Sequence, residues 1–230
     1  SGSRPDTTVV VVEVDEAPVV SGAVSLNNHG AFTTGSNQVS ISLHVNDALA
    51  WGERFSLGAT LSSGVRVLRA GASAAMGAGG AKLNGRLTSM TYTVVEGDGA
   101  AANLTGTSQS WHLDLEYPFI RSRAANVRGT AGYDFRTMTD LASGIVTKER
   151  DVRSAGLGLS GDAVGGGGYT SWSVSYFAGE SQVLQGADPN VSGPYSKIAA
   201  AFTRVRRLAG RYSLTVRASG QWAAANLDST

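Results

Sequence analysis

The chain has 230 residues and a formal net charge of +1, with thirty glycines and no cysteine. Lack of cysteine excludes disulfides and thiolate metal sites, and the nearly balanced charge provides no basic field for nucleic acid. Mean hydropathy is −0.05 and the longest aliphatic run spans residues 9–12, far short of the ~20 apolar residues that a membrane-spanning helix needs.

Residues 7–16 are the first periodic segment, and they predict an amphipathic strand that ends at Ala17 and Pro18. From residue 20 onward a two-residue hydrophobic alternation restarts again and again. Residues 38–45 are typical, because Val39, Ile41 and the following odd positions are apolar and the even positions are polar. Since successive side chains of a strand point to opposite faces, each such stretch predicts a strand with one apolar and one polar face.

The alternation predicts about eleven strands. We expect them at residues 20–28, 37–46, 54–62, 65–76, 81–96, 108–119, 126–139, 151–162, 169–184, 196–206 and 210–226. Connections after even-numbered strands are mostly short, whereas residues 97–107, 140–150 and 185–195 predict longer polar loops. Outer-membrane barrels combine short periplasmic turns with longer outer loops, so the amino terminus is expected on the periplasmic side.

The fold class predicted by these strands is all-β, an antiparallel transmembrane β-barrel. Eleven is an odd number, and an open sheet edge in lipid would leave backbone groups unpaired, so we expect the chain to be part of a larger barrel. Trp51, Tyr117 and Phe119 are predicted near periplasmic strand ends, and Trp111, Phe135 and Trp222 near outer ends, as interfacial girdles. The alternative is a soluble β-sandwich in which these rings fill the core.

The polar faces carry the charged side chains. His112, Asp114 and Glu116 share one face of a strand. The next strand carries Arg128, Asp134 and Arg136 on its polar face. In a barrel these faces line the lumen, so we predict as pore-lining residues Asp114, Glu116, Arg128, Asp134 and Arg136. A solvated face of a soluble sheet would show the same pattern.

Motifs for chemistry are few. Residues 156–161 match G-x-G-x-x-G, but no helix is predicted after them to receive a pyrophosphate. The three histidines lack metal-ligand spacing, and no G-x-S-x-G elbow is present. Asp114 and Glu116 have a spacing that an acid/base pair could use, but no saccharide cleft is indicated. We therefore expect no enzyme activity, cofactor, metal or nucleic-acid partner.

Several segments resemble one known family in the same order along the chain. Residues 111–126 (WHLDLEYPFIRSRAAN), 129–135 (GTAGYDF), 157–162 (LGLSGD) and 219–229 (SGQWAAANLDS) resemble strands of two-partner secretion translocators of the haemolysin activation/secretion family. At the front, residues 4–18 resemble the last strand of a periplasmic POTRA domain. Ser21, Gly22, residues 26–30 and Gly35 resemble the opening hairpin of the barrel.

This resemblance covers essentially the whole chain. It implies that residues 1–18 end a POTRA domain and residues 19–230 form the amino-terminal part of an outer-membrane barrel of roughly sixteen strands. It further implies a pore, surrounded by outer-membrane lipid, that translocates a large secreted partner of the haemolysin, haemagglutinin or adhesin type. A passive porin, an autotransporter barrel and a soluble β-rich adhesin are the alternatives.

Overall fold

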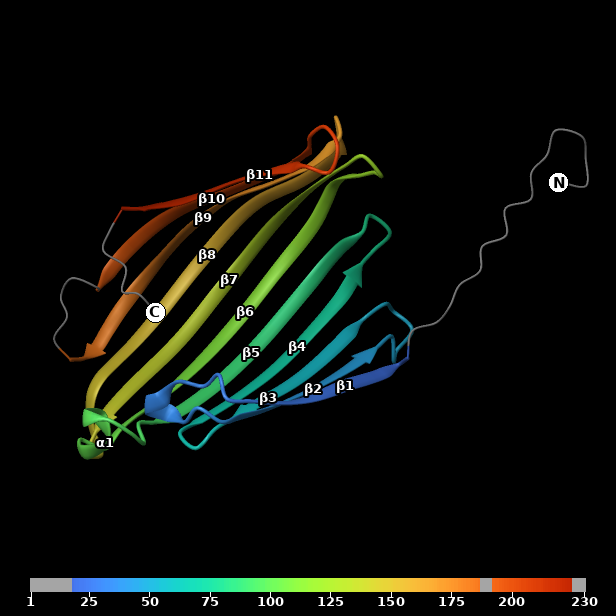
Figure 1. The fold of residues 1–230 in the computed structure, drawn as a ribbon. Helices are drawn as coiled ribbons and strands as arrows, with labels where there is room; N and C mark the ends of the chain where they lie inside the picture. Colours follow the sequence, from blue (N-terminus) through green and yellow to red (C-terminus); the bar gives the residue numbers. More distant parts are fainter. Residues whose placement is uncertain (1–17, 187–191, 225–230) are drawn as a thin grey trace, which may run out of the picture.

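The computed structural model describes residues 18–186 and 192–224, which form one eleven-stranded antiparallel sheet (Figure 1). Its strands follow one another in chain order, so every strand is hydrogen-bonded to its sequence neighbours. The strands are β1 (Val20–Asn27), β2 (Gln38–Asn46), β3 (Arg54–Leu61), β4 (Val65–Met76), β5 (Ala81–Thr93), β6 (Leu104–Arg121), β7 (Ala125–Ala142), β8 (Ile145–Gly165), β9 (Gly168–Gln185), β10 (Gly193–Arg207) and β11 (Ser213–Ala223).

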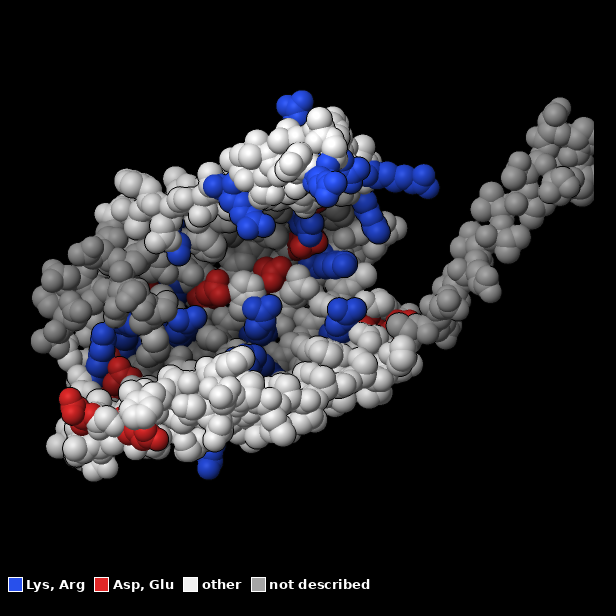
Figure 2. Space-filling view, viewed as in Figure 1, with Lys and Arg blue, Asp and Glu red and all other residues white. Residues whose placement is uncertain are grey.

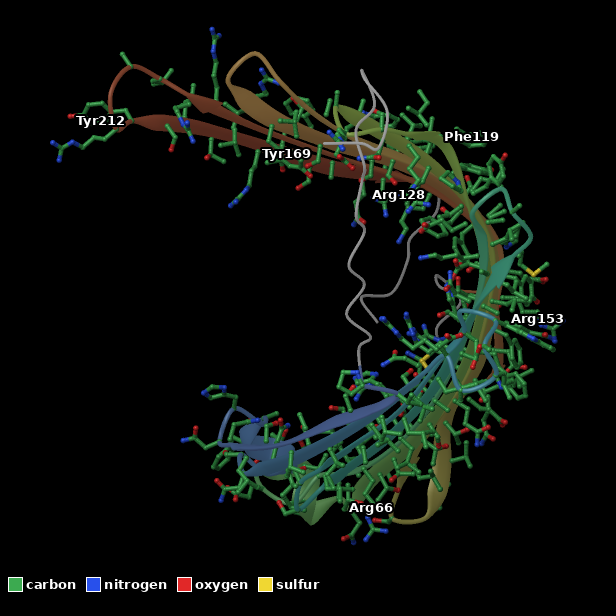
Figure 3. All side chains as sticks on the ribbon, turned by 90° about the vertical axis from the view of Figure 1, so that its right-hand side faces the viewer. Arg66, Phe119, Arg128, Arg153, Tyr169 and Tyr212 are labelled. Carbon is green, nitrogen blue, oxygen red and sulfur yellow. The ribbon has the colours of Figure 1, made fainter. Side chains whose placement is uncertain are left out.

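The sheet bends into part of a cylinder (Figure 3). Phe119 and Arg153 lie on its convex side, whereas Arg128 lies on the concave side. Within the described ranges, β1 and β11 each pair with a single strand and form the two edges. In those ranges no helix is long and apolar enough to cross a membrane. The expected antiparallel barrel wall is confirmed.

The apolar face of the sheet is exposed. Val39, Leu57, Leu113 and Val174 are 36%, 56%, 53% and 47% exposed, respectively. Among the described residues the one buried hydrophobic side chain is Val67, which lies on the concave side because its neighbours along β4 point outward. A soluble sandwich requires a dry core between two faces. The described residues form none, so the sandwich alternative is not supported.

One predicted loop is wrong. Residues 140–150 are mostly strand, because β7 and β8 continue until they meet at Ser143 and Gly144. Both turn residues have positive φ, 49° and 79°, which suits a two-residue hairpin whose twist matches its strands. The polar residues of this segment continue the hydrogen-bonded pairing of β7 with β8 instead of forming a loop. β6 begins before its predicted start, and β7 ends after its predicted end. Trp111 and Phe135 therefore lie in mid-strand and not near the outer ends.

Three connections at one end of the sheet form a joined rim. The connection between β1 and β2 contains the 3-10 helix η1 (Phe32–Thr34), and the connection between β5 and β6 contains α1 (Asp98–Ala101). Gly64 lies in the third connection, between β3 and β4. Its N–H donates to the carbonyl oxygen of Thr34 at 2.8 Å, and Val95 N–H of the β5–β6 connection donates to the carbonyl oxygen of Thr33 at 2.7 Å. A Cβ on Gly64 would lie 2.3 Å from the Thr93 carbonyl oxygen, so this close approach requires glycine.

A carboxylate organises the connection between β2 and β3. Glu53 is only 5% exposed; its Oε1 accepts from Leu49 N–H at 2.6 Å and its Oε2 from Trp51 N–H at 3.1 Å. The hydrogen bond from the Leu49 backbone is the main cause that lowers the pKa of Glu53 below its ordinary 4.5. The ionised carboxylate therefore stabilises a compact turn.

Aromatic rings cover glycines on neighbouring strands. A Cβ on Gly161 of β8 would lie 2.8 Å from the Trp172 ring of β9, and one on Gly129 of β7 would lie 2.6 Å from the ring of Phe119. Tyr117 packs edge-on against Phe119 at 5.3 Å between ring centroids. Because a single-layer sheet has no interior, this ring-on-glycine packing takes the place of a core.

Glu53 makes the turn between β2 and β3 sensitive to pH. Because folding lowers its pKa, its stabilisation is complete above pH ~4.5 and is lost as the pH falls through the lower folded pKa. In the natural full-length protein, Glu53→Gln should reduce hydrogen-exchange protection of the Leu49 and Trp51 amides at pH 7. The wild type should lose that protection only below pH ~4.5, and equal protection in both proteins at pH 7 would contradict the role of the carboxylate.

Replacing Gly161 tests the ring-on-glycine packing. Gly161→Val should destabilise the full-length protein by about 1–3 kcal/mol, because the added side chain displaces the Trp172 ring. Urea unfolding in detergent measures the change. Gly165→Val is the matched control on the same strand, since a Cβ at Gly165 meets nothing within 4 Å. Equal destabilisation by both changes would contradict the packing explanation.

Candidate functional site on the concave face

Strand register decides which charged side chains share the concave face. His112 of β6 lies opposite Asp134 of β7, and Arg128 lies opposite Ser160 of β8. The apolar residues between them, such as Leu113 and Tyr133, are opposite one another on the convex face. All five residues predicted to line the pore therefore fall on the polar face of the curved sheet.

The densest cluster joins three strands through His112. Its Nδ1 is 2.6 Å from Asp134 Oδ1, and its Nε2 is 2.9 Å from Asp114 Oδ1. Asn84 Nδ2 of β5 donates to the other oxygen of Asp114 at 2.8 Å. His112 therefore joins the carboxylates of two neighbouring strands through both of its ring nitrogens.

Arg128 takes part in a second, looser group. Its Nη2 is 3.7 Å from Asp162 Oδ1 of β8, and Asn126 Nδ2 donates to Asp162 Oδ2 at 3.0 Å. Glu116 and Arg136 share the same face, opposite Lys82 and Ser110, respectively. Neither makes an ion pair within 4.0 Å among the described residues. The structure therefore brings three of the five predicted residues into bonded clusters and leaves two beside them.

Further cations on the concave face were not among the predicted residues. Figure 2 shows basic and acidic side chains gathered in the hollow of the sheet. By register the additional inward cations include Arg69, Lys82, Arg86, Lys197 and Arg217. Lys82, Asn84 and Arg86 alternate with Leu83, Gly85 and Leu87. That polar-apolar alternation is the signal that could have identified the inward-facing cations of β5.

Tyr92 reaches across a strand on the concave face. Its hydroxyl donates to Asp140 Oδ1 of β7 at 2.8 Å, although β6 lies between. The intervening residue is Gly106, where a Cβ would lie 2.3 Å from the tyrosine ring. A contact that skips a strand depends on the missing side chain of Gly106, and hydrophobic alternation carries no signal for it.

The G-x-G-x-x-G match lies within a strand of the described residues. Residues 156–161 lie inside β8, and the strand offers no helix amino terminus for a dinucleotide. Within the described part of the chain, no group of three or more His, Asp or Glu side chains could hold a metal ion.

Comparisons with known proteins match this architecture. CdiB from Escherichia coli is 19% identical, with a TM-score of 0.79 over 93% of this chain and 42% of that one. CdiB from Acinetobacter baumannii is 16% identical, with a TM-score of 0.66 over 92% of this chain and 40% of that one. BamA from Haemophilus ducreyi lacking POTRA domains 1–3 is 12% identical, with a TM-score of 0.55 over 92% and 42%.

At such identities these structures show a shared barrel fold, and this chain spans less than half the length of each of them. Comparison with curated proteins gives no significant match. A family model described as haemolysin secretion/activation protein ShlB/FhaC/HecB matches residues 6–230. The chain therefore belongs to this haemolysin secretion/activation family, and membership together with the barrel fold places it in the bacterial outer membrane.

Proposed function

We propose that the chain forms part of the wall of an outer-membrane pore that exports a large secreted partner protein by two-partner secretion. The supporting observation is the two-faced sheet: apolar side chains cover the convex face, and charged side chains fill the concave one. A barrel wall of this kind is wetted by lipid outside and by water inside. Family membership favours a translocator over a passive porin or an autotransporter barrel.

Transport through this wall needs no chemical step. Asp114 and Asp134 are both engaged by His112, and Asp162 by Arg128, so the wall can stay hydrated without binding a passing chain tightly. An extended client exposes many backbone and polar groups, which the water and polar side chains of the lumen can satisfy. Folding of the client outside would then oppose its return.

The proposed orientation places the amino terminus in the periplasm. Residues 1–17, including nearly all of the expected POTRA end, lie outside the described residues, so that assignment remains a proposal. Under it, β1 runs outward and the joined rim of the β1–β2, β3–β4 and β5–β6 connections faces the exterior. POTRA domains would recognise the partner by strand addition at a sheet edge.

Neutralising one carboxylate tests the lumenal assignment. In planar bilayers, Asp134→Asn in the natural full-length protein should shift ion selectivity toward anions, because a negative charge leaves the lumen. Glu180→Gln is the matched control, since Glu180 lies opposite Arg153 on the convex face. An equal shift in both variants, or none in Asp134→Asn, would contradict the assignment. Charge reversal, Asp134→Arg, should enlarge the shift.

Export itself is tested by co-expression with a candidate partner. Cells that produce the full-length protein should release the partner to the medium, and cells lacking it should retain the partner in the periplasm. The charge variants described above should fold normally. Heat-modifiable electrophoretic mobility measures whether each variant is folded. Release of the partner at the same rate without the full-length protein would overturn the proposed function.

A further inference from the structure

A groove on the convex face interrupts the otherwise bulky apolar surface. It occupies about 880 Å³ between Phe55 and Leu57 of β3 on one side and Trp111 and Leu113 of β6 on the other. Its floor is lined by Ala70 and other small residues of β4 and β5. A second groove of about 580 Å³ shares Leu57, Ala70, Leu87 and Trp111 with the first. The two therefore form one continuous trough, which we call the convex trough.

The length of the convex trough suits one lipid leaflet. Along β4 it runs from Leu68 to Ala72, about 13 Å at the rise of a strand. The hydrocarbon thickness of a single leaflet is about 15 Å. A trough of that length, open along its side and walled by Leu57, Leu87 and Trp111, matches an acyl chain lying against the wall.

Apolar contact alone would select no particular lipid. Lipid tails are as apolar as the side chains they touch, so in a bilayer selectivity must come from packing and polar groups. Arg66 provides such a group. It lies two residues beyond Leu68 on β4, about 7 Å away along the same face, and Figure 3 shows it on the convex side.

Arg66 carries a charge that the described residues do not neutralise. It is exposed, no carboxylate of the described residues lies within 4.0 Å of it, and its cross-strand neighbours are Leu61 and Thr91. Arg153, the other arginine near the trough, packs over the Phe135 ring at 5.5 Å and lies opposite Glu180. Arg66 is therefore the cation available to an anionic head group.

The geometry points to a binding site for a phosphorylated acyl glycolipid of the outer leaflet, of the lipopolysaccharide class. One acyl chain would lie in the convex trough, and Arg66 would donate charge-assisted hydrogen bonds to a phosphate. The choice of leaflet rests on the proposed orientation, which places the start of β4 and the joined rim at the outer surface. A phosphate lipid there would seal the wall beside the pore.

Native mass spectrometry of the detergent-solubilised full-length protein tests the site. Bisphosphorylated lipid A should bind saturably, and Arg66→Gln should weaken its affinity about tenfold, the loss expected for one charge-assisted contact. Ala72→Leu, which fills the floor of the trough, should weaken it as well. The controls Arg206→Gln and Ala218→Leu change convex-face residues on β10 and β11, and should leave the affinity unchanged.

Three results would overturn the inference: binding that does not saturate, equal losses in the controls, or tighter binding of phosphatidylglycerol than of lipid A. If Ala72→Leu fails to fold, Arg66→Gln still decides, because this exposed side chain makes no hydrogen bond or ion pair with the described residues. Partner export is measured separately in the same variants. If the wild-type protein exports no partner, the proposed function is contradicted. Lipid binding that does not saturate, together with normal export, would contradict only the lipid site.

Discussion

Backbone hydrogen bonding in lipid is the constraint on which the structure depends. No water is available in the hydrocarbon region, so each N–H and C=O must find a partner on a neighbouring strand. Consecutive antiparallel pairing from β1 to β11 meets this need with the shortest connections. The pairing also forces side chains to alternate, so one strand must supply a surface for lipid and a surface for water at once. Strands of 18 to 21 residues, such as β6 to β9, exceed the 9–11 residues that cross a bilayer, and their excess length extends into water.

A wall one strand thick must obtain its packing along the surface. Gly161 with Trp172 and Gly129 with Phe119 show how this is done. The missing side chain of each glycine lets a ring from the neighbouring strand lie close to the backbone. On the concave face Gly106 permits a polar contact in the same way, because its missing side chain lets Tyr92 reach Asp140 two strands away. Glycine is usually unfavourable inside a strand. Here it permits contacts that couple strands beyond their immediate hydrogen-bonded neighbours.

Period-two alternation was enough to predict the architecture. All eleven strands occur near their predicted positions, and β4 matches its predicted bounds, because the chemistry of each residue reports the face on which it lies. Loops were harder. Residues 140–150 are polar in either state, and above the membrane a polar strand and a polar loop have the same composition. The cluster of His112, Asp114 and Asp134 could be placed on one face, but the bonds within it depend on register, which a sequence does not state. Ring-on-glycine contacts and the joined rim have no periodic signal at all.

The distribution of charge explains how a single sheet can serve two environments. On the concave face carboxylates from β6 to β8 bring His112 and Arg128 into bonded groups, while inward cations such as Arg69 and Arg86 lie on β4 and β5. A wall with some charges compensated and others free can attract ions and water without fixing a passing chain in one place. On the convex face an uncompensated charge is unfavourable, because that face meets lipid. Arg153 accordingly packs over the Phe135 ring and lies opposite Glu180. Arg66 has neither partner, so the cost of its charge falls only when an anion from the bilayer lies against it.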